Sequence, residues 1–441
     1  MNKVLIALIL AVVLSGSVYA TTISEADLIL SSDNVILMTG DKKAQPLSIA
    51  ITNKKIVWVG LHKDAKNIQG TKIDFGNQAI LPGFIDAHGH ASYLAFASQV
   101  ANIASPPVGK IKTIKDLQIE LKEFIKVSNL QPGQWLIGLG YDNSLLAEQR
   151  HPTKEDLDQV STEHPIYLIH VSAHLGATNS MGLALANINS NTPDPSGGKI
   201  RRYKNSSEPN GVFEESAAYP VQQLAMSAYK DPIGSVKKAM EIYASHGITT
   251  AQDGASSPEA IALMQAADDQ GMVNLDIISY PVGQNGLDKS IQTIKFGSYK
   301  GRVKVGGIKL ILDGSPQGKT AYLTEPYYKP PHSESDSYKG YPLISQKEVS
   351  KWVSIYADLN IPIMAHANGD AAADMLIKAV KNADMKNDHR TIMIHAQTVR
   401  EDQLDQMKKL KIIPSYFSTH TFYWGDWHRD SVFGEDRAMR I

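Results

Sequence analysis

The stretch that decides the fold is Ile80-Leu81-Pro82-Gly83-Phe84-Ile85-Asp86-Ala87-His88-Gly89-His90. We interpret it as an apolar strand that carries two histidines at its end. Because successive side chains of a strand point to opposite faces, His88 and His90 share one face, and Gly89 between them allows a close approach. Neutral imidazole is a common ligand of Zn²⁺ and of other first-row metals. The pattern therefore predicts the start of a metal site, with an incidental surface pair as the alternative.

The composition is that of a globular protein with a sizeable core. The 441 residues suffice for two or three domains, or for one large barrel with additions. Hydrophobic residues make up 43% of the chain and charged residues 20%. A formal net charge of −1 gives no electrostatic support for nucleic acid or an anionic membrane surface as a partner. Since there is no cysteine, any metal must be held by histidine, carboxylate or a modified side chain.

The N-terminus resembles a secretion signal over residues 1–20. Lys3 supplies the positive charge, Val4–Leu14 forms an apolar run, and Val18-Tyr19-Ala20 provides the small residues of a cleavage site. A membrane anchor is the alternative, but it needs about 20 apolar residues and this run is shorter. We therefore expect a soluble periplasmic or secreted protein with no membrane span after cleavage.

Short strands are expected in residues 21–79, which we interpret as a small, β-sandwich-like domain. The predicted strands are Ala26–Leu30, Val35–Met38, Pro46–Ile51, Lys55–Val59 and Thr71–Asp74.

Residues 91–231 are expected to form an inserted subdomain. It contains a predicted helix, Ile114–Val127, and two predicted strands, Trp135–Gly140 and Ile166–Val171. Ser190–Gly211 is rich in Ser, Asn, Pro and Gly, which favours a long loop.

From about residue 232 helices and strands alternate, which predicts a parallel α/β sheet. Helix signals include Asp231-Pro232 and the capping box of Ser345 with Glu348. We predict a (β/α)8 TIM-type barrel over residues 80–441, lacking its eighth strand before the chain ends at Ile441. Its seven strands lie near residues 80, 248, 275, 305, 362, 391 and 412. An open, flavodoxin-like sheet is the alternative, but no glycine-rich phosphate loop accompanies it.

Polar residues gather where these strands end, as the chemistry of a barrel requires. Lys309 lies in the apolar run Val305–Asp313, His366 follows Ile361–Ala365, and His395 follows Thr391–Ile394. Four histidines at equivalent strand ends favour a metal site over satisfied core histidines.

These segments resemble the amidohydrolase superfamily, and most closely its amidohydrolase-3 branch, which includes N-substituted formamide deformylases. The resemblance is carried by Leu81–His90, Lys309–Ser315, His366–Asp370 and Ile394–Gln397, and it extends from about Ala26 to the end of the chain, so that the chain resembles a C-terminally truncated member.

The resemblance implies a metal-dependent hydrolase of carbon–nitrogen bonds other than peptide bonds. It implies one or two ions of Zn²⁺ or another divalent metal, a small amide-like substrate, and allows for a homodimer. The implied metal ligands are His88, His90, Lys309, His366 and His395. In some members the lysine is carboxylated and bridges two metals; a buried or ion-paired Lys309 near a single metal remains the alternative.

The remaining catalytic residue of the family is an aspartate on the eighth strand, before which this sequence ends. His420 and Asp370 are the candidates to replace it in proton transfer. Substrate contacts are expected from His174, Tyr141, Asp142 and Asp313, for which hydrogen-bonded or turn-forming roles are the alternatives. A catalytically impaired metal-binding relic of such an enzyme is the second function that the sequence allows.

Overall fold

The chain folds into two compact units, Met1–Phe84 and Ile85–Ile441. Each unit contains its own clusters of buried apolar side chains. The predicted leader, residues 1–20, lies outside the described residues, and so does His174. The computed structural model describes residues 23–40, 44–143, 145–171, 175–195, 198–227, 231–284, 295–330, 335–385 and 388–441.

The first unit is a small β-sheet of order β3-β2-β1-β4, with β5 also paired to β1. Asn53 and Lys54, both at positive φ, make the tight turn between β2 and β3. The described residues form one sheet layer, so the predicted sandwich-like pair of layers is not found among them. The elements are β1 (Glu25–Val35), β2 (Gln45–Thr52), β3 (Lys55–Leu61), α1 (His62–Ala65), β4 (Gln69–Asp74) and β5 (Ala79–Ile80).

A six-stranded sheet of order β11-β12-β10-β9-β8-β7 occupies the predicted insertion. The prediction of a loop over Ser190–Gly211 is wrong in part, because β11 and the start of β12 pair within it. The strands are β7 (Ala101–Asn102), β8 (Leu136–Tyr141), β9 (Ile166–His170), β10 (Leu175–Thr178), β11 (Gly198–Arg202) and β12 (Pro209–Glu215). The helices are α3 (Ile114–Val127), α4 (Lys154–Asp158), α5 (Ser180–Leu185), the 3₁₀ turn η1 (Ser216–Ala218) and α6 (Tyr219–Ser227).

The remaining strands form two sheets rather than one closed barrel. One has the order β15-β16-β14-β13-β6 and the other β17-β18-β19-β20. A single parallel bridge between Val282 and Lys309 joins them. The strand predicted near residue 80 is replaced by two short pieces, β5 and β6. The strands are β6 (Phe84–Ile85), β13 (Ile248–Ser256), β14 (Asp276–Pro281), β15 (Tyr299–Lys300), β16 (Val303–Val305), β17 (Ile308–Ile311), β18 (Ile363–Ala367), β19 (Ile392–His395) and β20 (Ile413–Tyr416).

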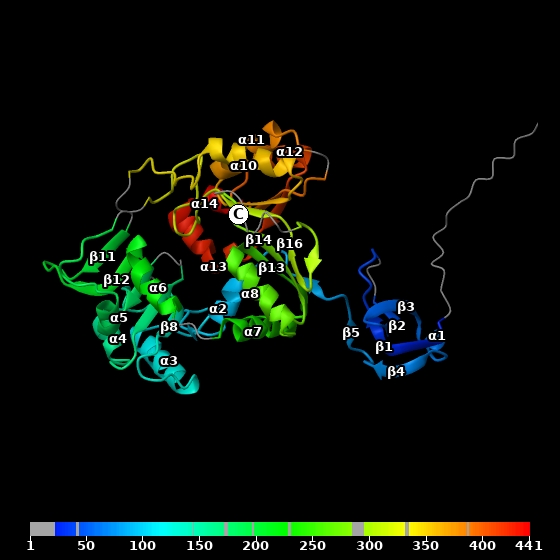
Figure 1. Cartoon of the computed structure of the whole chain (residues 1–441). Helices are drawn as coiled ribbons and strands as arrows, with labels where there is room; N and C mark the ends of the chain where they lie inside the picture. The colour runs from blue at the N-terminus through cyan, green and yellow to red at the C-terminus, as the bar shows by residue number, and fades with distance from the viewer. Residues whose placement is uncertain are drawn as a thin grey trace, which may run out of the picture. The chain divides into compact units, whose positions relative to one another are not determined.

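Helices α10, α11 and α12 lie side by side, yellow to orange in Figure 1, and pack on the second of these sheets. Val349, Val353 and Tyr356 recur on one face of α10 and are fully buried there. The predicted capping box is confirmed, since the Ser345 hydroxyl accepts from Glu348 N. The helices are α2 (Ala91–Ala97), α7 (Pro232–Ser245), α8 (Pro258–Asp269), α10 (Gln346–Asp358), α11 (Asp370–Asn382), α12 (Glu401–Leu410), α13 (Thr419–Trp427), the π-helical turn η2 (His428–Val432) and α14 (Glu435–Ala438).

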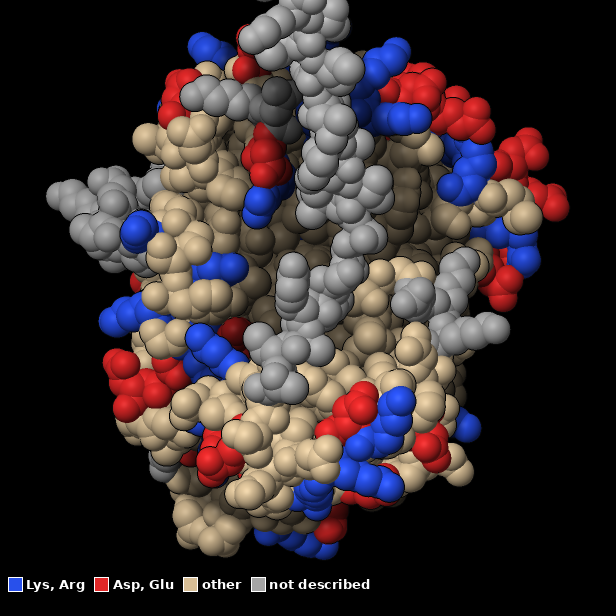
Figure 2. Space-filling view, turned by 90° about the vertical axis from the view of Figure 1, so that its right-hand side faces the viewer, with Lys and Arg blue, Asp and Glu red and all other residues tan. Residues whose placement is uncertain are grey.

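The face shown in Figure 2 carries basic and acidic side chains interspersed, without a large patch of either sign. This distribution agrees with the formal net charge of −1. Within the described ranges, no helix is both long and apolar enough to cross a membrane.

Candidate active site

Four histidines from distant parts of the sequence meet in the second unit, and we call them the histidine cluster. The ring centroids of His88 and His90 lie 5.1 Å apart, and those of His88 and His395 5.6 Å apart. His366 and His395 lie 4.7 Å apart. The structure thus brings together the four imidazoles that the sequence singles out as metal ligands.

The secondary structure around His88 and His90 differs from the predicted strand end. Strand β6 ends at Ile85, so His88 and His90 do not share a strand face. They lie in the turn that follows, and His90 is the residue before the first turn of α2. An antiparallel bridge between His90 and Asp253 fixes this turn to β13.

His366 and His395 come from the neighbouring parallel strands β18 and β19, whose register pairs His366 with Ile394 and Ala367 with His395. His395 (φ 70°) and Ala396 (φ 47°) both have left-handed backbone conformations. Such conformations are unfavourable for residues with a side chain and occur mainly where surrounding structure enforces them. The backbone therefore turns sharply at the point where β19 delivers its imidazole.

The side chain of Lys309 is buried, and no acidic partner for it is found among the described residues. Its side chain in β17 is 2% exposed, and no hydrogen bond or ion pair of its ammonium is found within the described part of the chain. Burial lowers the pKa of Lys309 to about 7. Its charge contributes to lowering the pKa values of His88, His90 and His395, after their own burial. Lys309 therefore lies within electrostatic reach of the histidine cluster.

Gln252 sets the orientation and tautomer of His88. The Gln252 amide donates through Nε2 to the carbonyl oxygen of Ala87 (3.1 Å), which turns its Oε1 toward His88. His88 Nδ1 then donates to this oxygen at 2.7 Å. Burial is the main reason that the pKa of His88 falls to about 3, so the ring is neutral. Its other nitrogen, Nε2, carries the lone pair and is buried without a hydrogen-bond partner.

Asp313 performs the same task for His366. His366 Nδ1 donates to Asp313 Oδ1 at 3.1 Å, which leaves the lone pair on Nε2. In this structure that lone pair accepts from Asn368 Nδ2 at 3.2 Å. Three backbone amides also donate to this carboxylate, from Asn368 (3.0 Å), Gly369 (2.7 Å) and Tyr322 (3.0 Å). Asp313 is 1% exposed, so the predicted substrate contact is replaced by a positioning role.

Asp253 places a further carboxylate beside the histidine cluster. Its Oδ1 accepts from Ser92 N at 3.1 Å and from Ser92 Oγ at 2.8 Å. Its Oδ2 is buried and has no hydrogen-bond partner in the part of the chain that the structure describes. The negative charge of Asp253 partly offsets the burial that lowers the pKa of His90. A partnerless carboxylate oxygen next to neutral imidazoles is a favourable environment for a cation.

The residue types at this site fit a divalent metal, although the side chains are not yet at the distances from one another that metal ligands require. His88 and His366 each carry a lone pair on Nε2, of which that of His366 accepts from Asn368 Nδ2. Among the described residues, no donor is found for the Oδ2 atom of Asp253. Imidazole nitrogen and carboxylate oxygen are suitable ligands for Zn²⁺ and similar metals. Among the residues that the structure describes, no three His, Cys, Asp or Glu side chains are arranged at metal-binding spacing.

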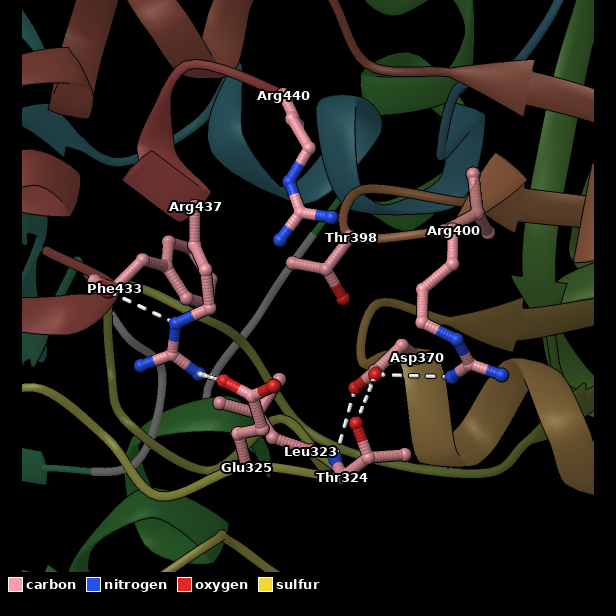
Figure 3. A pocket seen from close by; sticks show the side chains of 10 residues that line it. Leu323, Thr324, Glu325, Asp370, Thr398, Arg400, Phe433, Arg437 and Arg440 are labelled. Atoms are coloured by element: carbon pink, nitrogen blue, oxygen red, sulfur yellow. Dashed lines mark hydrogen bonds and ion pairs between the residues drawn. The ribbon is translucent and has the colours of Figure 1, made fainter. Parts of the chain in front are cut away.

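Asp370 is engaged elsewhere, in a small pocket close to the ends of β18 and β19 (Figure 3). Arg400 donates to its carboxylate at 3.0 Å, and Thr324 donates to it through both its backbone amide and its hydroxyl. Figure 3 shows Arg437 paired with Glu325 in the same pocket. With these partners Asp370 is a poor candidate for the proton transfer predicted from the sequence.

The inserted sheet holds Tyr141 and Asp142. Tyr141 is fully buried, and its hydroxyl is hydrogen-bonded to His151 Nδ1 at 3.0 Å. Asp142 lies 3.9 Å from His170 Nε2. Tyr141 has no exposed surface, so its predicted substrate contact has no support in this structure and stays a prediction. The equivalent prediction for His174 falls outside the described residues.

His420 lies next to the histidine cluster, as the sequence suggests. The Phe417 ring is in contact with both His395 (6.0 Å between centroids) and His420 (4.9 Å). His420 is also hydrogen-bonded to His428, which sequence reasoning missed together with Gln252 and Asp253. Gln252 and Asp253 are adjacent polar residues in the middle of β13, and both are buried, which the sequence pattern alone does not indicate.

The sequence pattern of the Amidohydrolase family matches residues 71–441. The chain belongs to this family. Membership of the Amidohydrolase family supports a hydrolase that acts on small-molecule substrates.

Two curated relatives agree with this assignment. The chain is 25% identical over 393 residues to an N-substituted formamide deformylase of Arthrobacter pascens, covering 86% of this chain and 70% of that protein. It is 25% identical over 370 residues to the putative amidohydrolase YtcJ of Bacillus subtilis, covering 80% of this chain and 65% of that protein.

Two solved structures show the same fold. Both are crystal structures of uncharacterised metal-dependent hydrolases. The one from Pyrococcus furiosus has a TM-score of 0.71 at 23% identity, covering 94% of this chain and 81% of that chain. The one from Pyrococcus horikoshii has a TM-score of 0.72 at 22% identity, covering 94% of this chain and 79% of that chain. The homodimer allowed for by the sequence analysis has no support in these findings.

Proposed function

We propose that this amidohydrolase cleaves carbon–nitrogen bonds other than peptide bonds in small amide-like substrates, and that it uses a divalent metal, Zn²⁺ being our first choice. The observation that carries the proposal is the pair of tautomers fixed by Gln252 and Asp313. Each holds one imidazole with its lone pair on Nε2. The lone pair of His88 has no partner among the described residues, and that of His366 would exchange its hydrogen bond from Asn368 for a metal.

His88, His90, His366 and His395 would hold the metal, with Lys309 beside them. The Asp253 carboxylate is a further candidate, because its Oδ2 has no other partner. When bound, a divalent cation lowers the pKa of a water molecule toward about 7 and polarises the substrate carbonyl. A carboxylated Lys309 would place negative oxygens where an ammonium now opposes a cation, which is why we retain carboxylation as part of the proposal.

The chain's own groups would prepare this site in advance. Gln252 and Asp313 hold their imidazoles in one orientation, so that little reorganisation is needed when a cation binds. Burial lowers the pKa of His88, His90 and His395, which favours the neutral form that binds metal.

We further propose that β6, β13, β14 and β17–β20 belong to one open TIM-type barrel. The bridge between Val282 and Lys309 joins the two sheets, and the ring contact between His88 and His395 spans from the first strand to the sixth. Periplasmic or secreted localisation is also a proposal, based on the leader sequence of residues 1–20. Fractionation of cells producing the chain with and without these residues tests it.

The experiment for the proposed function compares three proteins: the full chain, His366→Ala, and a matched control, His246→Gln, whose exposed histidine lies at the end of α7. Metal content is measured by mass spectrometry, and hydrolysis is assayed on N-substituted formamides and other N-acyl amines. We expect metal and turnover in the full chain and in the control, and weaker metal binding with loss of turnover in His366→Ala. Bound metal with no turnover of any of these amides would contradict the proposal and favour the catalytically impaired relic.

A further inference from the structure

A second, smaller group of histidines lies beside the histidine cluster. His420 in α13 and His428 at the start of η2 are 3% and 1% exposed. His420 Nδ1 and His428 Nε2 lie 3.0 Å apart, at hydrogen-bond distance. Their ring planes are nearly parallel, with centroids 5.2 Å apart and an interplanar angle of 18°. Trp424 and Phe433 complete an apolar surrounding.

A bend in the backbone between His420 and His428 makes this contact possible. Residues eight apart in a regular α-helix are separated by about 12 Å along the axis, too far for a hydrogen bond between rings. Trp424 has non-helical angles (φ −132°, ψ 16°), and the following residues form a π-helical turn. Such turns are uncommon and occur frequently at functional sites. The bend at Trp424 thus brings two buried imidazoles into contact.

Both rings are neutral near pH 7. Burial lowers the pKa of His420 to about 4, helped by the charge of His428, and burial alone lowers the pKa of His428 to about 4. A neutral imidazole carries one N–H, on either Nδ1 or Nε2. The hydrogen bond between the rings therefore allows two arrangements of protons.

The buried environment of His428 distinguishes the two arrangements. Its Nδ1 is buried, and no hydrogen-bond partner is found for it in the described ranges of the chain. If His420 Nδ1 donated to His428, the proton of His428 would sit on this Nδ1 as an orphaned buried N–H. If His428 Nε2 donates instead, Nδ1 holds only a lone pair. Orphaned buried N–H groups are rarer than unsatisfied acceptors, so the second arrangement is favoured.

We propose that His428 is a positioning residue that fixes His420 with its proton on Nε2, so that His420 serves the substrate as a neutral hydrogen-bond donor. This inference rests on the proposed function, because the donor would act on the carbonyl oxygen of the amide as negative charge develops there. The closeness of His420 to the cluster, through Phe417 and through its effect on the pKa of His395, supports this role.

The proposal changes the chemistry predicted for His420. A neutral imidazole that gave up its N–H would become an imidazolate, which is unfavourable near pH 7. His420 therefore keeps its proton throughout and is not the acid that protonates the leaving amine. Its contribution is that of a fixed donor at an oxyanion, where removal of one such group typically lowers kcat by about 10²–10³-fold.

The first test reads the tautomers directly and needs no substrate. The full chain is labelled with [15N]histidine, and long-range 15N–1H correlation spectra are recorded near pH 7, with His420→Gln and His428→Gln variants for assignment. We expect both rings to carry the proton on Nε2. A proton on His420 Nδ1, or a doubly protonated ring, would overturn the inference even if the proposed function holds.

The second test uses turnover of the amide found for the full chain. Gln at position 428 can place its amide N–H near the position of Nε2, whereas Phe cannot donate, so we compare His428→Gln with His428→Phe. We expect His428→Phe to lower kcat by roughly 10²-fold with KM little changed, and His428→Gln to restore most of the loss. Equal losses in both variants, or no loss in His428→Phe, would contradict the positioning role.

Metal content and thermal midpoint are measured on the same samples, with His246→Gln as the control for removal of a histidine. Unchanged metal content in His428→Phe would separate this role from metal binding. If no amide is hydrolysed by the full chain, the proposed function fails, while the tautomer spectra still decide whether His428 fixes His420.

Discussion

The buried carboxylate of Asp313 provides the most quantitative prediction, through the substitution Asp313→Asn. Its two oxygens accept four hydrogen bonds: Oδ1 from His366 Nδ1 and Asn368 N, and Oδ2 from Gly369 N and Tyr322 N. An asparagine of nearly the same shape has one oxygen and one NH₂ group. In either orientation the NH₂ group faces two donors, so two hydrogen bonds are lost.

The expected loss of stability follows from these contacts. A hydrogen bond to a charged group contributes about 1.5–3 kcal/mol, so two such bonds amount to about 3–6 kcal/mol. This is a large part of the roughly 5–15 kcal/mol by which folded proteins are stable. We expect Asp313→Asn to lower the free energy of unfolding by about this amount in metal-free protein, while any residual metal affinity falls by at least about 10-fold.

The assay is urea unfolding followed by circular dichroism, with an unchanged slope of the free energy against urea as the sign that only stability has changed. The matched control is Asp388→Asn, since Asp388 is an exposed carboxylate paired with Arg390. No measurable change is expected there. A loss below about 1 kcal/mol in Asp313→Asn would refute the reasoning, because buried bonds to charged groups are worth more than that.

Three further predictions follow from other contacts. Gln252→Leu removes the acceptor of His88 Nδ1 and should weaken Zn²⁺ binding by about 10–100-fold in titration calorimetry, whereas unchanged affinity would contradict the tautomer assigned to His88. Asp370→Asn should lower the thermal midpoint, because Arg400 and Thr324 lose a buried acceptor. It should leave kcat within about threefold of the value for the full chain. A loss of kcat like that of His366→Ala would restore Asp370 as a catalytic residue. In the folded chain the pKa values of His420 and His428 are about 4, below their ordinary value of 6.5. Between these pH values the unfolded chain binds protons at both histidines and the folded chain does not. The free energy of unfolding should therefore be highest above pH 6.5 and should fall as the pH drops toward 4. Urea midpoints that stay level between pH 7 and 5 would count against their burial in the neutral form.

The alternation of helices and strands was predictable from the sequence, because apolar periodicity and caps mark each element locally. Ser345 and Glu348 form the predicted capping box, and the predicted helix Ile114–Val127 is observed with the same bounds. That His88, His90, His366 and His395 lie close together was also predictable, because they follow predicted parallel strands and match the residues that carry the resemblance to the family.

Other features depend on contacts that no local pattern contains. The run Val303–Leu312 reads as one strand, but β16 and β17 belong to different sheets and separate at Gly306 and Gly307. A Cβ at Gly307 would lie 2.3 Å from the Pro362 carbonyl oxygen, so only glycine allows this close passage.

Tertiary pairing also overrides composition elsewhere. Ser190–Gly211 has the composition of a loop, yet β11 pairs with β12, which in turn pairs with β10. The bonds from Gln252 to His88 and from His428 to His420 are side-chain contacts whose geometry depends on a packed backbone. Sequence patterns identified the histidines themselves, but not the residues that fix their tautomers.

The most direct test of the central claim is X-ray absorption spectroscopy at the zinc edge of the full chain loaded with Zn²⁺. If the histidine cluster holds the metal, the spectrum will show several imidazole nitrogens at about 2.0–2.1 Å, and His366→Ala will remove at least one of them. A zinc shell made only of oxygen, or one that is unchanged in His366→Ala, would contradict a metal site built from these four imidazoles.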